Sequence, residues 1–131
     1  MPAADPTAPR RCPCGSGLTY DECCGPLHRR ERAAPTAEQL MRSRFSAFAV
    51  GDAAYLLATW HPSTRPATLE LDASMRWYRL DVLRTERGGP LDRDGVVAFD
   101  AHYRSPDGAG VQNEVSAFRR DDGRWFYLAE S

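Results

Sequence analysis

Residues 12–24 read CPCGSGLTYDECC and contain all four cysteines of the 131-residue chain. The first pair is separated by one residue, eight residues follow, and the second pair is adjacent. Pro13 stiffens the first pair, and Gly15 and Gly17 permit a tight backbone turn between the pairs. Four thiolates can therefore converge on one point, as a tetrahedral zinc site requires. We predict that one Zn²⁺ ion is bound by Cys12, Cys14, Cys23 and Cys24.

A site of this kind has a structural role. Four sulfur ligands close the coordination shell, so no position is left for a water molecule that the metal could activate. Zinc binding contributes about 10–16 kcal/mol to the folding of such segments, and residues 12–28 are too few to form a hydrophobic core of their own. We therefore expect this segment to unfold without its metal.

Two alternatives to coordination by four sulfurs stay open at this point. His28 lies four residues after Cys24 and could replace one cysteine as a ligand. The thiols could instead act in redox sensing, although a disulfide between adjacent cysteines is strained and the sequence has no Cys-x-x-Cys motif. In a reducing compartment, such a cluster favours a metal over disulfides.

The charges of the chain are nearly balanced. Seventeen basic and 18 acidic residues give a net charge of -1, so no overall field draws the protein to nucleic acid or to an anionic membrane. No stretch approaches the about 18 apolar residues of a membrane span, and residues 1–11 lack the apolar core of a signal peptide. We therefore expect a soluble protein of the cytoplasm.

Composition divides the chain into four parts. Residues 1–11 are rich in proline and alanine, which predicts a disordered leader. Residues 12–28 form the cysteine-rich module, and the charged residues 29–35 form a linker or a short solvated turn. Residues 36–131 carry enough apolar side chains for one hydrophobic core, so we expect a single main domain with a small appendage.

Helical signals dominate the start of the main domain. Thr36 and Gln39 form a capping box, and apolar residues then recur at helical spacing until Gly51 ends the segment. Asp52 can cap a second helix, which Pro62 ends. We expect the two helices to pack against each other as a hairpin.

The second half of the domain reads as a sheet. Residues 63–75 are ambiguous, because Pro66 could open a third short helix or the segment could be a loop, and we favour the helix. From Trp77 the apolar residues alternate with polar ones and are interrupted by turn signals. Strands are predicted from residue 77 to the turn at residues 88–90, and over residues 96–104, 111–120 and 125–128. Helices followed by an antiparallel meander predict an α+β domain.

The cysteine-rich segment carries a resemblance to a known motif. Cys12-Pro13-Cys14-Gly15-Ser16-Gly17, Tyr20 and Cys23-Cys24-Gly25 together resemble the SEC-C zinc motif. In the bacterial translocase motor SecA this motif closes the C-terminal tail, where it contacts a chaperone and ribosomes, and a histidine stands there in place of Cys24. The resemblance implies a bound zinc ion and a protein or ribosome-associated partner.

The main domain carries a second resemblance. Residues 40–48 read LMRSRFSAF and residues 55–62 read YLLATWHP. Both stretches resemble the shared core of the bacterial YchJ-like proteins, which pair one SEC-C motif with a nuclear-transport-factor-2-like domain. This implies a cone-shaped α+β domain, with N-terminal helices packed on a bent antiparallel sheet around a pocket. Homodimers are common for that fold, and no reaction is implied.

Several polar residues of the main domain could carry chemistry, but none forms a catalytic constellation. His61 could act as a general base, although a residue that interacts with the end of a helix is the better interpretation. Asp81, Asp100 and His102 alternate along the strands. Asp100 and His102 share one strand face, which we interpret as a solvated face.

Three arginines could bind an anion. Arg42 and Arg44 lie two apart on the first helix and therefore point in different directions. No more than one of them can share a face with Arg65, which follows the second helix.

Two functions from different classes remain. The first is a zinc-binding adaptor, in which the SEC-C module engages a protein or ribosome-associated partner. The alternative is a small-molecule-binding protein or enzyme that uses the cone pocket, an idea that rests on fold analogy alone.

Overall fold

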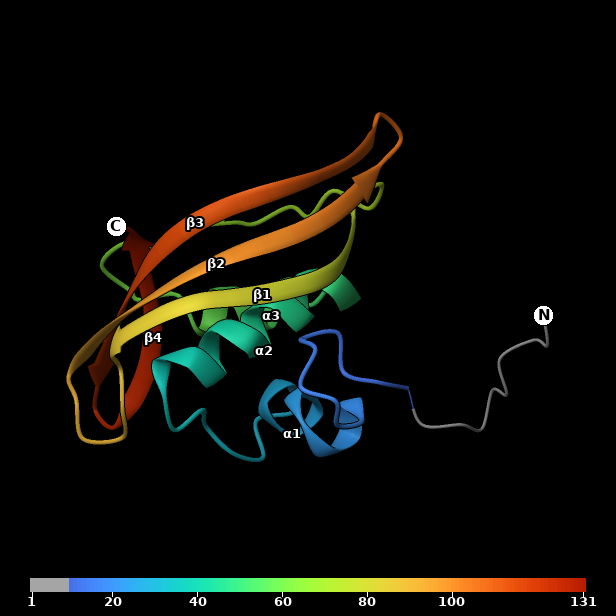
Figure 1. The fold of residues 1–131 in the computed structure, drawn as a ribbon. Helices are drawn as coiled ribbons and strands as arrows, with labels where there is room; N and C mark the ends of the chain where they lie inside the picture. Colours follow the sequence, from blue (N-terminus) through green and yellow to red (C-terminus); the bar gives the residue numbers. More distant parts are fainter. Residues whose placement is uncertain (1–9) are drawn as a thin grey trace.

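A four-stranded antiparallel sheet covers the helices of the main domain in the computed structural model, which describes residues 10–131 (Figure 1). The elements are η1 (Tyr20–Glu22), α1 (Cys24–His28), α2 (Ala37–Val50), α3 (Ala53–Ala58), β1 (Arg76–Arg87), β2 (Asp94–Ser105), β3 (Gly108–Asp121) and β4 (Arg124–Glu130). The cysteine-rich segment and α1 lie on the opposite side of α2 from the sheet (Figure 1). Most of the predicted leader, residues 1–9, lies outside the described residues.

The predicted α+β class is confirmed. The strands pair in chain order, β1-β2-β3-β4, and each neighbouring pair is antiparallel. The second, third and fourth predicted strands each lie inside an observed strand that is a few residues longer. The alternating pattern was therefore a reliable guide to which residues form strands, and a weaker guide to where the strands end.

The sheet is bent, which lets it wrap the helices. The pairing register shifts in β1 after Trp77 and again after Val82, and in β4 at Leu128, opposite Ala117 and Phe118 of β3. Such irregularities bend a strand and increase its twist. The concave face supplies one side of the hydrophobic core through Leu80, Val97, Phe99, Ala101, Phe118 and Trp125.

Both predicted helices of the main domain are present and capped as expected. The hydroxyl of Thr36 accepts a hydrogen bond from the backbone N–H of Gln39, and α2 ends at Gly51 in the left-handed region with φ 79°. The carboxylate of Asp52 accepts from the backbone N–H of Tyr55 and so starts α3. None of the helices in the described part of the chain is long and apolar enough to cross a membrane.

The third helix predicted within residues 63–75 is wrong, because the chain there consists of turns, a bend and backbone without regular secondary structure. Leu69 and Leu71 are partly buried and pack against the core. Two side chains that are two residues apart lie on the same side of an extended chain, whereas a helix would point them in different directions. Burial of both leucines against one core therefore disfavours a helix.

The cysteine-rich module packs directly on the main domain. α1 contacts α2, and Ala34, in the connecting segment, is buried in the main core. The carbonyl of Pro35 accepts a hydrogen bond from the indole N–H of Trp125 at 3.2 Å. The connection between module and domain is thus held by the core of the domain.

Gly88 generates a prediction about the junction of β1 and α2. Its φ is 81°, and a Cβ atom there would lie 2.8 Å from the Cβ of Ala37. Gly88→Ala should lower the free energy of unfolding by about 2–4 kcal/mol, because backbone strain and overpacking add. Denaturant titration measures this loss.

The matched control is Gly123→Ala, in the turn between β3 and β4. Gly123 has a similar φ of 77° but nothing within 4 Å of an added Cβ atom. It should lose only the about 1–2 kcal/mol of backbone strain. Equal losses in the two variants would contradict the close packing of Gly88 on α2.

Candidate metal centre

The structure brings the four cysteine side chains together. Their sulfur atoms all lie within 4.8 Å of one another. The Sγ atoms of Cys14 and Cys23 are 3.6 Å apart, and those of Cys23 and Cys24 are 3.9 Å apart. Four ligands at about 2.3 Å from a tetrahedral ion are separated by about 3.8 Å. The cluster is therefore compatible with metal binding.

The local backbone explains how the first two cysteines reach this point. The N–H of Cys12 donates to the carbonyl of Leu18 at 2.9 Å, and the N–H of Gly15 donates to the carbonyl of Cys12 at 3.2 Å. Gly15 and Gly17 have φ angles of 81° and 88°, which residues with side chains rarely adopt. The two glycines thus close the turn that the sequence predicted. The second pair of cysteines stands at the start of α1.

The thiols of Cys12, Cys14 and Cys24 perturb one another because they are crowded and buried. Hydrogen bonding from Cys14 and Cys24 lowers the pKa of Cys12, whereas hydrogen bonding to Cys12 and Cys14 raises the pKa of Cys24. Hydrogen bonding to Cys12 raises the pKa of Cys14 to about 11. One thiolate is therefore stabilised by its neighbours, whereas several at this distance repel one another. A divalent cation would remove that repulsion.

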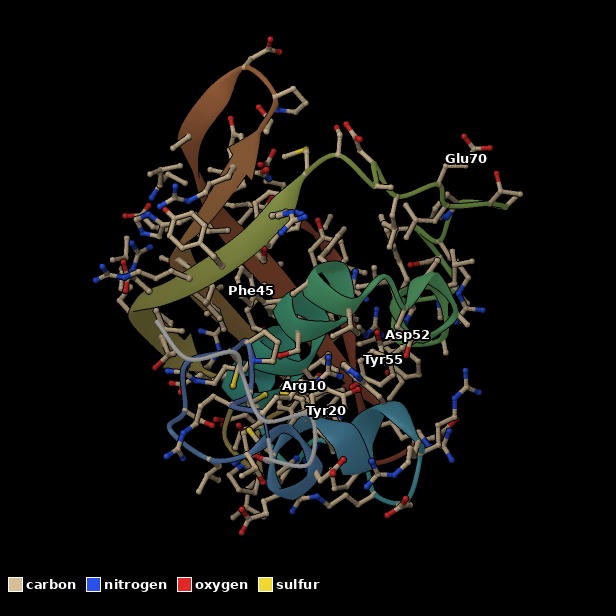
Figure 2. All side chains as sticks on the ribbon, turned by 90° about the vertical axis from the view of Figure 1, so that its right-hand side faces the viewer. Arg10, Tyr20, Phe45, Asp52, Tyr55 and Glu70 are labelled. Carbon is tan, nitrogen blue, oxygen red and sulfur yellow. The ribbon has the colours of Figure 1, made fainter. Side chains whose placement is uncertain are left out.

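His28, the alternative ligand, lies outside the cluster of sulfurs. Its Nδ1 is 2.6 Å from the hydroxyl of Tyr20, and its Nε2 is 2.8 Å from the carbonyl oxygen of Ser43 in α2. Both ring nitrogens are therefore engaged. Its ring also packs 4.6 Å from that of Tyr55, and Figure 2 shows Tyr20 and Tyr55 where the module meets the main domain. His28 joins the module to α2.

Sequence reasoning missed the residues of α2 that support the cysteines. Ser46 is completely buried, and its hydroxyl donates to the Sγ of Cys24 at 3.3 Å and lies 3.5 Å from the Sγ of Cys12. Arg42 donates to the carbonyl of Cys14 at 2.9 Å. The only sequence signal for this contact was a serine on the buried side of a helix. That signal does not identify the hydrogen-bond partner of the hydroxyl.

The other candidate residues form pairs on the main domain, apart from the thiols. The Nε2 of His61 lies 2.6 Å from a carboxylate oxygen of Asp121. The backbone N–H of Ser63 lies 3.1 Å from Nδ1 of the same ring, so Nε2 is the ring nitrogen that faces Asp121. Hydrogen bonding from His61 lowers the pKa of Asp121. The pair ties the segment after α3 to the end of β3.

His102 finds its partner on the neighbouring strand. Its Nε2 lies 2.8 Å from Asp81 of β1, and this hydrogen bond lowers the pKa of that carboxylate. Asp100 accepts instead from the side-chain amide of Asn113 in β3. Asp100 and His102 are therefore not paired with each other. On the face of the sheet opposite Phe99, polar side chains of β2 thus pair with polar side chains of β1 and β3.

The three arginines do not assemble into one anion site. Arg42 reaches the cysteine module, whereas Arg44 is buried on the other side of α2, as their spacing predicted. Arg65 donates to the backbone carbonyl of Trp60 through two nitrogens. Each arginine thus has a separate environment.

Comparison with known proteins agrees with this architecture. A family model described as YchJ, middle NTF2-like domain, matches residues 36–130, and the SEC-C motif matches residues 11–26. The chain belongs to the YchJ-like family. A UPF0225 protein of Corynebacterium glutamicum is 57% identical over 118 residues, which are 90% of this chain and 94% of that protein. A UPF0225 protein of Streptomyces coelicolor is 52% identical over 122 residues, 93% and 94% of the two chains.

Solved structures of SEC-C motif proteins share the fold. The solution structure of one from Rhodopseudomonas palustris is 36% identical, with a TM-score of 0.79 over 92% of this chain and 96% of that chain. The crystal structure of one from Psychrobacter arcticus is 29% identical, with a TM-score of 0.74 over 89% and 79%. The predicted order of a SEC-C module followed by a nuclear-transport-factor-2-like domain is confirmed.

Proposed function

We propose that the protein binds one zinc ion through Cys12, Cys14, Cys23 and Cys24 and uses the module that this ion holds as a binding surface for a protein or ribosome-associated partner. The spacing and burial of the four sulfurs support the choice of metal, because soft thiolates in a tetrahedral set favour zinc. The ion would supply folding energy, since a closed shell leaves no site for activated water.

The observation that carries the adaptor role is an apolar side chain on the outside of the module. Leu18 is 49% exposed, on the loop between the two cysteine pairs. It borders a groove of about 230 Å³ between the module and α2, which Glu22 and Arg32 also line. A single exposed apolar side chain is common on protein surfaces, but Leu18 lies beside a groove with charged residues, and this combination supports a protein-binding surface.

The redox state of the thiols fits a reducing compartment. All four cysteines are free, and three of them are buried. Thiols that coordinate metal persist where glutathione and thioredoxin keep them reduced. We therefore propose that the protein works in the cytoplasm.

Zinc content and its dependence on α2 test the first part of the proposal. Freshly purified protein should contain one zinc per chain, measured by native mass spectrometry. Ser46→Ala removes the hydroxyl beside Cys12 and Cys24. Because such supporting contacts tune a metal site, the variant should lose about tenfold or more in zinc affinity in competition with a chelator.

Ser43→Ala is the matched control. Ser43 is an equally buried serine of α2, but its hydroxyl bonds Tyr55 and the carbonyl of Leu40. This variant should lose stability and keep its zinc affinity. Metal-free protein with oxidised cysteines would contradict zinc binding, and equal affinities in the two variants would contradict the role of Ser46.

The partner is tested with two surface variants that leave the cysteines intact. Leu18→Glu places a charge at the exposed tip of the module, and Leu91→Glu makes the same change at a residue that is 92% exposed in the loop between β1 and β2. Immobilised zinc-loaded protein is exposed to host lysate and to purified ribosomes. Leu18→Glu should lose the bound partner, and Leu91→Glu should retain it.

Either of two results would overturn the adaptor role. One is that both leucine variants capture the same partners as the native protein. The other is that capture continues after zinc has been removed with a chelator.

A further inference from the structure

A second feature of the molecule lies on the other side of α2 from the module. A cavity of about 240 Å³ is enclosed between α2 and the concave face of the sheet. Its walls are largely aromatic, and Figure 2 shows Phe45 of α2 on the side that faces the sheet. Exposed Gln112 of β3 lines one edge, so the cavity opens to solvent there. The volume lies below the about 300 Å³ at which drug-sized pockets begin, which restricts an occupant to a small molecule.

One wall of this cavity holds a buried cation. Arg44 is only 3% exposed, and burial lowers its pKa to about 10, so the guanidinium is charged at neutral pH. Its Nη1 donates to the carbonyl of Leu56 at 2.8 Å and to the hydroxyl of Thr59 at 2.7 Å. No carboxylate of residues 10–131 forms an ion pair with Arg44, and its Nε and Nη2 have no hydrogen-bond partner there.

A buried charge without a counter-ion lowers the stability of the fold. The presence of Arg44 at this position therefore indicates a role other than stabilisation. Its guanidinium carbon lies 4.7 Å from the ring centre of Tyr127 and 5.3 Å from that of Trp60. These rings hold the guanidinium in place but cannot accept two in-plane hydrogen bonds. Three N–H groups of Arg44, one on Nε and two on Nη2, are thus left for an acceptor that enters from the cavity.

Trp60 adds a second donor without an acceptor. Its ring lines the same cavity, and its Nε1 is fully buried with no hydrogen-bond partner in the described part of the chain. Such orphaned donors are rare in native proteins. The ring lies against the guanidinium of Arg44, so the resonance of this N–H is sensitive to an anion that binds there.

The opposite wall offers an acceptor. Glu114 of β3 lines the cavity and accepts hydrogen bonds from Ser116 and from the side chain of Gln112. Its charge acts on Arg44, but the two form no ion pair. The cavity therefore has a cationic side and an anionic side, with aromatic walls between them.

We propose that this cavity binds a small organic carboxylate that has an aromatic or apolar body and an amino or hydroxyl group. The carboxylate pairs with Arg44 beside the ring of Trp60, the body contacts the aromatic walls, and the amino or hydroxyl group donates to Glu114. This site is separate from the metal centre and independent of the adaptor role.

The indole N–H resonances of the zinc-loaded full chain report binding. Trp60 has the unpartnered N–H, whereas the N–H of Trp125 is already bonded to the carbonyl of Pro35 and serves as an internal control. The probes are L-phenylalanine, hydrocinnamate without the amino group, phenethylamine without the carboxylate, and inorganic phosphate. We expect L-phenylalanine at millimolar concentration to shift the Trp60 resonance and leave that of Trp125 in place.

The order of the probes tests each contact. Hydrocinnamate should bind more weakly than L-phenylalanine, and phenethylamine and phosphate should leave Trp60 unchanged. No shift with either carboxylate would overturn the proposal. An equal shift with phenethylamine would show only that apolar molecules fill the cavity, and an equal shift with phosphate would show only a general anion site. Either of these two results would also overturn the proposal.

Two variants separate binding from folding. Arg44→Met should weaken L-phenylalanine binding by about tenfold or more, because a hydrogen-bonded charge pair is lost. Glu114→Gln changes a partly exposed residue of β3 and keeps its shape. Glu114→Gln should abolish the preference for L-phenylalanine over hydrocinnamate. If that preference survives in Glu114→Gln, the proposed contact with Glu114 is contradicted. This test remains valid even if Arg44→Met fails to fold.

Discussion

The hydroxyl of Ser46 lies between two of the four sulfur atoms, inside the contact between the cysteine-rich module and α2. Because Ser46 is fully buried, water cannot reach its hydroxyl and take the place of the two sulfur atoms as hydrogen-bond partners. His28 and Arg42 add hydrogen bonds across the same contact. α2 is therefore the common wall of the molecule, with the thiols on one side and the aromatic core on the other.

Much of this architecture could be predicted because its signals are local. The caps at Thr36 and Asp52, the left-handed Gly51 and the period-two pattern from β1 onward are properties of neighbouring residues. The cysteine spacing is also a local signal. The two glycines between the cysteine pairs adopt the left-handed conformation that the predicted turn needs. Residues separated by a few positions were thus enough to identify the elements and the sulfur cluster.

The parts that sequence reasoning missed depend on contacts between distant residues. The absence of a helix at Leu69 and Leu71 depends on their burial against the core, which no local rule reports. Nothing in the sequence distinguishes Arg44 from the other arginines. Its burial without an ion pair follows only from the positions of α3 and the sheet. The docking of the module likewise depends on Ser46 and His28, whose partners lie on other elements.

Because Ser46 of α2 contacts two of the thiols, a metal bound at the proposed site should stabilise α2 as well as the module. Amide hydrogen exchange of the zinc-loaded chain, compared before and after chelation, tests this claim most directly. Removal of zinc should reduce protection in residues 12–28 and along the length of α2, while β2 and β3 keep theirs. Loss of protection confined to residues 12–28, with α2 unchanged, would contradict the claim and leave the module as an independent appendage.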